Sequence, residues 1–183
     1  MYDKTKTACF TGHRIAAFHT LGISANIVKL QMCHLLEQAI IKAYNEGYRN
    51  FISGGAIGVD QWAMEVLIHL KSLSEYSDIK LIVARPFPSQ ACKWPLFGQE
   101  EYLNLCKAAD EIVDVSEDPY QVWKMHQRNA WMVDHSSLLI AVKFEQVISG
   151  GTASCFSYGR KQGLNIIHID PETNTLTYIE GNV

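Results

Sequence analysis

The chain has 183 residues, of which 48% are hydrophobic and 19% are charged, a composition typical of folded proteins rather than disordered ones. Its length predicts a single domain over residues 1–183, and its formal net charge of -3 argues against a protein that grips nucleic acid through many phosphates. No apolar run reaches the ~18 residues of a membrane span, and the first residues lack the apolar core of a secretory signal, so we expect a cytoplasmic protein without a membrane partner.

Short β-type apolar runs alternate along the chain with longer segments of helical period. This alternation predicts a Rossmann-like α/β fold, in which an open, mostly parallel sheet is flanked by helices on both faces. The expected strands are 7–11, 50–53, 79–84, 111–115, 137–142 and 165–170, and TLTYIE at 175–180 predicts a further edge strand. The expected helices are about 24–46, 58–73, 95–108, 119–134 and 152–162.

The segments that follow the expected strands are the first candidates for a binding site, because ligands of open parallel sheets lie outside the carboxyl ends of the strands. Gly12 and Arg14 follow the first strand, and Arg85 follows the third. Two glycine-rich turns, SGGAIGVD at 53–60 and SGGTAS at 149–154, follow the second and fifth strands, and each leads into a helix. We therefore expect both turns to lie at one edge of the sheet.

Each turn has the chemistry of a phosphate or ribose site. Glycine lets the backbone approach an anion closely, and a helix that begins at once offers free N–H groups and the positive end of its dipole. Arginine adds paired contacts to phosphate or carboxylate oxygens. Either turn taken alone is equally typical of tight packing, and an isolated arginine is more often part of a surface ion pair.

The expected ligand-binding residues combine both turns with their neighbours. Asp60 would cap its helix or accept from a ribose hydroxyl, and Trp62 would stack on a base or pack in the core. The full set is Gly12, Arg14, Ser53, Gly54, Gly55, Gly58, Asp60, Trp62, Arg85, Gly150, Gly151 and Thr152.

Five sequence blocks carry a family resemblance: TGHR, ISGGAIGVDQWAMEV, the PF turn after the third strand, RNAWMVDHSSLLIAV and GGTASCFSYGRKQG. Together they cover about residues 7–170 and resemble the YpsA-like family of the SLOG superfamily, whose wider members include the DprA and LOG proteins. The resemblance implies a Rossmann-like domain of a bacterium or phage, with a nucleotide-derivative site at its glycine turns and a link to stress or cell division. The family's Gly-x-Asp motif falls on Gly58 and Asp60, and its second glycine motif falls on 150–152.

One departure from the wider superfamily bears on catalysis. LOG-type enzymes, which cleave the N-glycosidic bond of a nucleoside monophosphate, carry a PGGxGTxxE motif whose glutamate acts at the ribose. Here SGGTASCFS has neither the proline nor that glutamate. We therefore expect a sensor or regulatory protein that binds a nucleotide or a nucleotide-derived small molecule.

Two alternatives stay open. One is a nucleotide N-glycosidic-bond hydrolase or transferase, LOG-like or deoxyribosyltransferase-like, for which Asp60, Asp134 and Glu100 or Glu101 are the carboxylates to test and no catalytic residue is assigned. The other is a DprA-like nucleic-acid-binding module, which the net charge does not favour.

Other metal-binding, cofactor-binding and catalytic motifs are missing from the sequence. The histidines have no metal-ligand spacing, the cysteines form no C-x-x-C pair, and neither a P-loop nor a G-x-S-x-G turn occurs. We therefore expect no metal and no cofactor besides the nucleotide-derived ligand. The expected helix at 24–46 carries more apolar residues than one core-facing stripe needs, so we also expect a homodimer.

Overall fold

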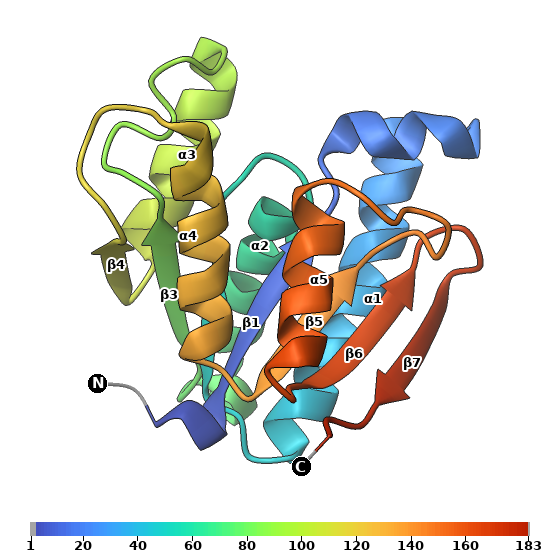
Figure 1. Ribbon diagram of the computed structural model, residues 1–183. Helices are drawn as coiled ribbons and strands as arrows, with labels where there is room; N and C mark the ends of the chain where they lie inside the picture. Colours follow the sequence, from blue (N-terminus) through green and yellow to red (C-terminus); the bar gives the residue numbers. More distant parts are fainter. Residues whose placement is uncertain (1–2, 183) are drawn as a thin grey trace.

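The computed structural model describes residues 3–182, which form a seven-stranded sheet between two layers of helices (Figure 1). The strands are β1 (Thr7–Gly12), β2 (Asn50–Ser53), β3 (Lys80–Arg85), β4 (Glu111–Asp114), β5 (Leu138–Val142), β6 (Asn165–Asp170) and β7 (Thr175–Ile179). Their order across the sheet is β4-β3-β2-β1-β5-β6-β7. All neighbouring pairs are parallel except β6 and β7, which are antiparallel. The predicted fold class and the predicted edge strand are confirmed.

The two faces of the sheet are covered by different helices. α1 (Ala25–Asn45), α2 (Val59–Lys71) and α3 (Leu96–Ala108) cover one face, and α4 (Val122–Asp134) and α5 (Gly151–Lys161) cover the other (Figure 1). Successive side chains of β1 point to opposite faces of the sheet, so Ala8 and Phe10 pack with the first group of helices and Cys9 packs with the second. No helix within residues 3–182 combines the length and the apolarity needed to cross a membrane.

Short 3-10 helices occupy Lys4–Lys6, Ile15–Leu21 and Ser74–Tyr76. The helix at Ile15–Leu21, labelled η2, is absent from the sequence-based expectation, which leaves residues 12–23 without regular structure. It buries Phe18 and ends at Gly22, whose φ is 66°. Thus η2 places the residues after β1 against the body of the protein rather than in a free loop.

The strand order creates one topological switch point. From β1 the chain steps outward through β2, β3 and β4, and it then returns to place β5 on the other side of β1. The connections that leave β1 and β5 therefore diverge to opposite faces of the sheet. In an open α/β sheet this divergence leaves a crevice at the carboxyl ends of the two strands.

Candidate functional site

A cleft of about 430 Å³ lies at this switch point, and its size is within the roughly 300–1,000 Å³ of small-molecule sites. Both helix layers and the end of β1 contribute to it. The residues that line it are Phe10, Thr11, Gly12, His13, Arg14, Ala17, Ala56, Asp60, Met125, Arg128, Asn129, Gly151 and Thr152. Five of the predicted site residues are therefore brought together here: Gly12, Arg14, Asp60, Gly151 and Thr152.

The N-terminus of α5 opens into the cleft. Gly150 precedes the helix with φ 94°, and no side chain caps the helix at that position. A Cβ on Gly151 would meet no atom within 4 Å, so the space beside the first helical N–H groups is free. The Thr152 hydroxyl donates to the carbonyl of Gly12 at 2.9 Å and fixes α5 against β1. These features give the cleft an uncapped positive helix end.

The glycine turn after β2 is filled by the protein itself. A Cβ on Gly54 would overlap the guanidinium of Arg128 and lie 2.7 Å from Oδ2 of Asp60. Gly55, with φ 64°, has the ring of Tyr102 where its Cβ would be. Packing alone therefore requires glycine at Gly54, where its absent side chain makes room for Arg128 beside Asp60.

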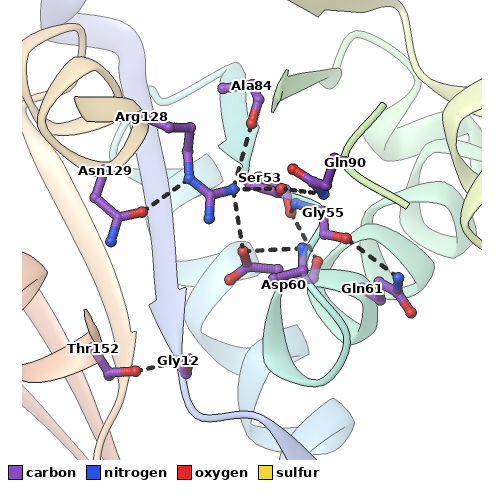
Figure 2. Close-up of polar contacts among 12 residues, drawn as sticks. Gly12, Ser53, Gly55, Asp60, Gln61, Ala84, Gln90, Arg128, Asn129 and Thr152 are labelled. Atoms are coloured by element: carbon purple, nitrogen blue, oxygen red, sulfur yellow. Dashed lines mark hydrogen bonds and ion pairs between the residues drawn. The ribbon is translucent and has the colours of Figure 1, made fainter. Parts of the chain in front are cut away.

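Arg128 reaches from α4 over the ends of β2 and β3, although it is only 5% exposed (Figure 2). Its Nη1 donates to the carbonyls of Gly54 and Ala84 and lies 3.8 Å from Oδ2 of Asp60. Its Nε donates to Oδ1 of Asn129 at 2.9 Å. Nη2 has no hydrogen-bond partner among residues 3–182. The cleft is thus lined by a buried cation that keeps one donor nitrogen free.

Asp60 stands in the first turn of α2, beside this cation. Its Oδ2 accepts from the N–H of Ala56 at 3.3 Å, and Oδ1 has no hydrogen-bond partner in the described chain. Burial raises the pKa of the Asp60 carboxyl, while Arg128, the Ala56 N–H and Arg14 oppose that rise. The cleft therefore pairs a free carboxylate oxygen with a free guanidinium nitrogen.

His13 completes the wall formed by the residues after β1. Its Nε2 accepts from the N–H of Phe144 at 3.3 Å, and its carbonyl accepts from the N–H of Val59 at 3.3 Å. Burial, together with the nearby charge of Lys143, lowers the pKa of the imidazole. His13 is therefore a neutral acceptor that ties the β1 connection to the segment after β5, while its carbonyl ties it to the start of α2. A Cβ on Gly12 would overlap the side chain of Val59, so this glycine also permits close packing.

Several predicted site residues lie outside the cleft. Trp62 is 5% exposed and packs in the core, with its ring centroid 5.4 Å from that of Phe18. Arg85 donates from Nε and Nη2 to both carboxylate oxygens of Asp114 on β4, each at 2.7 Å. Gly150 is exposed at the edge of the cleft.

Ser53 does not line the cleft, but it holds the β2–α2 turn that carries Asp60. Its buried hydroxyl donates to the carbonyl of Asp60 at 2.9 Å and accepts from the N–H of Gly55 at 3.2 Å. Gly58, with φ 110°, starts α2 and lies close to the backbone of His13. These two residues shape the turn that presents Asp60.

The other carboxylates considered for catalysis do not line the cleft. Asp134 is the last residue of α4 and accepts from the Tyr158 hydroxyl at 2.9 Å. Glu100 and Glu101 lie on α3. Asp60 is the carboxylate that lines the cleft among residues 3–182. No cluster of three or more His, Cys, Asp or Glu side chains suited to a metal ion occurs in that same range.

Arg128 is the functional candidate that sequence reasoning missed, and a signal for it exists. It stands three residues after Met125 and four before Met132, so helical spacing puts it on the face of α4 that looks inward. An arginine on such a face needs buried partners. Sequence spacing indicates this burial but not the carbonyls and the carboxylate that provide it.

Comparison with protein families and curated proteins gives a consistent result. The model of the YpsA family, described as the YspA SLOG family, matches residues 8–171. The chain is similar to the uncharacterized SPbeta prophage-derived protein YoqJ of Bacillus subtilis, with 32% identity over 170 residues that cover 84% of this chain and 95% of that protein. It is also similar to a UPF0398 protein of Brevibacillus brevis, with 28% identity over 138 residues that cover 75% of this chain and 70% of that protein.

Among solved structures the chain is similar to two DNA processing proteins. DNA processing protein A of Helicobacter pylori, described for its single-stranded DNA binding mode, gives a TM-score of 0.57 at 18% identity, and the match covers 91% of this chain. DNA processing protein A (DprA) of Streptococcus pneumoniae gives a TM-score of 0.54 at 14% identity, and the match covers 90% of this chain. The match spans 66% and 50% of those two chains, respectively. Similarity at such low identity establishes the fold alone.

Proposed function

The chain belongs to the YspA SLOG family, and we propose that it binds a nucleotide or a nucleotide-derived small molecule in the cleft at the β1–β5 switch point. We propose further that it does so as a sensor or regulatory protein. The observation that carries the proposal is Arg128, a nearly buried cation whose free Nη2 lines the same cleft as the uncapped N-terminus of α5.

The phosphate of the ligand lies at the start of α5 in this proposal. Gly151 leaves the approach open, and free N–H groups at a helix N-terminus are suited to phosphate oxygens. Arg14, which is exposed and also lines the cleft, adds a second positive charge. The glycine turn after β2 is filled by Arg128 and is therefore not proposed as a second phosphate site.

The ribose lies between Asp60 and Arg128. A carboxylate oxygen accepts from sugar hydroxyls, and a guanidinium nitrogen donates to their oxygens. The free Oδ1 of Asp60 and the free Nη2 of Arg128 supply one partner of each kind. A polar ligand would therefore pair with one atom of each of two nearly buried side chains that keep unused hydrogen-bonding capacity.

An N-glycosidic-bond hydrolase or transferase is the second candidate function. Asp60 favours it, because a buried carboxyl of raised pKa beside the proposed ribose has the environment of a general base or nucleophile. The absent glutamate after the second glycine motif favours binding without turnover. Release of free base from the ligand separates the two functions.

The test places a carboxylate where the phosphate is proposed to bind. Gly151→Asp adds a negative charge at the first residue of α5, where the helix dipole favours it, so we expect the fold to be kept. Ala25→Asp is the matched control, because it adds the same charge to the first residue of α1, at an exposed position away from the cleft. Calorimetric titration with AMP, GMP, CMP, UMP, NAD and ADP-ribose measures binding, and chromatography of each mixture measures released base.

We expect at least one of these compounds to bind to the unmodified protein and to the Ala25→Asp variant. Gly151→Asp should weaken that binding by about tenfold or more through charge repulsion near the helix end. Equal affinities of the two variants, or no binding of any compound to the unmodified protein, would contradict the proposal. Free base formed during incubation would establish the enzyme instead of the sensor.

A further inference from the structure

A second cavity, of about 200 Å³, opens between α4 and α5 beside the cleft. It is lined by His126, Asn129, Ala130, Ser154, Cys155 and Tyr158, and we refer to it as the α4–α5 groove. Asn129 lines both the groove and the cleft. The two spaces therefore meet at one side chain, and a ligand in the cleft has an adjoining recess available to it.

The walls of the α4–α5 groove differ in chemistry from those of the cleft. Ala130 and Cys155 contribute small, uncharged side chains to the groove. Cys155 is 3% exposed, and burial raises the pKa of its thiol to about 11, so the thiol is uncharged at neutral pH. Rings flank it on both helices, His126 on α4 and Tyr158 on α5. Among residues 3–182 no Asp, Glu, Lys or Arg lines it, whereas Arg14, Asp60 and Arg128 line the cleft. The groove is suited to a flat, uncharged ring.

Asn129 supplies a hydrogen-bond donor at the junction. Because Nε of Arg128 can only donate, the atom of Asn129 that faces it at 2.9 Å must be the oxygen. The amide nitrogen of Asn129 then points away from Arg128 (Figure 2), and it has no hydrogen-bond partner within residues 3–182. Ring nitrogens and carbonyl oxygens of nucleobases are acceptors that match this free NH₂ group.

We propose that the α4–α5 groove receives the base of a nucleotide whose phosphate lies at the N-terminus of α5 and whose ribose lies between Asp60 and Arg128, next to Asn129. This inference rests on the proposed function and adds the place of the base. Gly151 and Ser154 are three residues apart on α5, a rise of about 4.5 Å along the helix axis. One helix therefore carries both the phosphate position and the base position, with the ribose spanning the short distance between them.

The groove also accounts for the kind of ligand. A sugar phosphate without a base would leave the groove empty, and a base alone would leave Arg128 without the sugar and the α5 N-terminus without an anion. The site thus fits a ligand that joins a phosphate to a flat heterocycle through a sugar. The opposite end of the cleft, near Arg14 and Ala17, is the competing place for the base.

The test fills the groove without touching the phosphate position. Ser154→Phe places an aromatic ring in the groove from an exposed position on α5, so we expect the fold to be unaffected. Ser157→Phe is the matched control, because Ser157 is exposed on the same helix and does not line the groove. Ala130→Leu fills the groove from α4 and gives an independent check. Affinities are measured for the four nucleoside monophosphates and for ribose 5-phosphate, which lacks the base.

We expect Ser154→Phe and Ala130→Leu to weaken the tightest-binding nucleoside monophosphate by about tenfold, while Ser157→Phe leaves it within about twofold. Ribose 5-phosphate should bind equally to all of these variants. If the unmodified protein binds a nucleotide and the groove variants bind it as well, the base lies elsewhere and only this inference fails. An equal loss for ribose 5-phosphate would also overturn it, because the substitution would then obstruct the phosphate position. If the unmodified protein binds no nucleotide, the proposed function fails first.

Discussion

Asp60 is the residue whose charge state should govern binding of the proposed ribose. Burial raises the pKa of its carboxyl above the ordinary 3.8, and the charge of Arg128 counteracts this rise. A protonated Asp60 loses its charge-assisted acceptor capacity. Nucleotide affinity should therefore fall as the pH falls through this raised pKa, which is at a higher pH than for an exposed aspartate.

Asp60→Asn isolates this effect, because the amide has a similar shape and does not titrate. We expect the affinity of the tightest nucleoside monophosphate to fall more steeply toward acid pH for the unmodified protein, by up to about tenfold per pH unit below the pKa. The phosphate of the ligand, whose second pKa is about 6, affects both proteins equally. Calorimetric titrations from neutral to acid pH measure the ratio, and parallel pH profiles for the two proteins would contradict a direct contact with Asp60.

The site residues differ in how far the sequence could predict them. Gly12, Asp60 and Gly151 were expected because each stands at the end of a strand or the start of a helix, and such places converge in a parallel sheet. Arg128 could not be placed in the same way, since it lies in mid-helix and reaches the cleft only through its long side chain. Trp62 shows the opposite case, because its position after a glycine turn suggested a ligand contact, whereas its ring packs against Phe18 in the core.

At the scale of elements, the connection between β2 and α2 is held by hydrogen bonds from side chains of the protein itself. The carbonyl of Gly54 accepts from Arg128 of α4 and from Nε2 of Gln90 at 3.2 Å, and Gln61 donates to the carbonyl of Gly55 at 3.2 Å. The missing side chain of Gly54 is what allows Arg128 to reach this turn. Part of the glycine motif is therefore explained by packing between the two helix layers.

Gly54→Ala should consequently destabilise the fold, while Gly151→Ala should not. The new Cβ at Gly54 would displace the guanidinium of Arg128, and we expect a loss of about 3 kcal/mol in the free energy of unfolding. At Gly151 the new Cβ meets no atom, so the change should be neutral or stabilising by up to about 1 kcal/mol. Urea unfolding of both variants measures the difference, and equal stabilities would show that the β2–α2 turn can relax around the added methyl group.

The helices and strands themselves follow closely from the sequence, whereas their arrangement does not. Apolar runs marked β1 to β6 to within one residue at either end. Five of these strands are buried and therefore need nearly continuous apolar residues, whereas β4, at the edge of the sheet, is mostly exposed. η2 was missed because its seven residues are too few for a helical period to show. The return of the chain from β4 to β5 across β1 is a long-range choice, and no local pattern specifies it.

At the scale of the whole molecule, both helix layers contribute residues to the cleft at the switch point. Asp60 comes from the layer of α2, while Arg128, Asn129 and Thr152 come from the layer of α4 and α5. A ligand in the cleft would therefore contact both layers at the carboxyl end of the central strand β1. The expected homodimer should therefore form through a surface outside the cleft.

We propose that the expected homodimer forms through one part of α1. Most of its apolar residues are used by the core, since Val28, Met32, Leu36 and further residues along the helix are buried. Ile27 and Leu30 are left 49% and 72% exposed, and Leu30 borders a groove of about 360 Å³ that α1 forms with α2. A two-fold axis would let Leu30 of each copy enter the groove of the other, which is the self-complementary form of a symmetric dimer.

Leu30→Glu should therefore separate the dimer, since it would place two charges in a contact whose burial is worth about 2 kcal/mol per leucine. Leu103→Glu on α3, where the leucine is 55% exposed, is the matched control and should leave the dimer intact. Sedimentation equilibrium over a range of protein concentrations measures both variants. A stable contact must cover more than these side chains, roughly 1,200 Å² in total, so the neighbouring surface of α2 must take part. A monomer at every concentration for the unmodified protein, or a dimer that persists in Leu30→Glu, would contradict an interface through this half of α1.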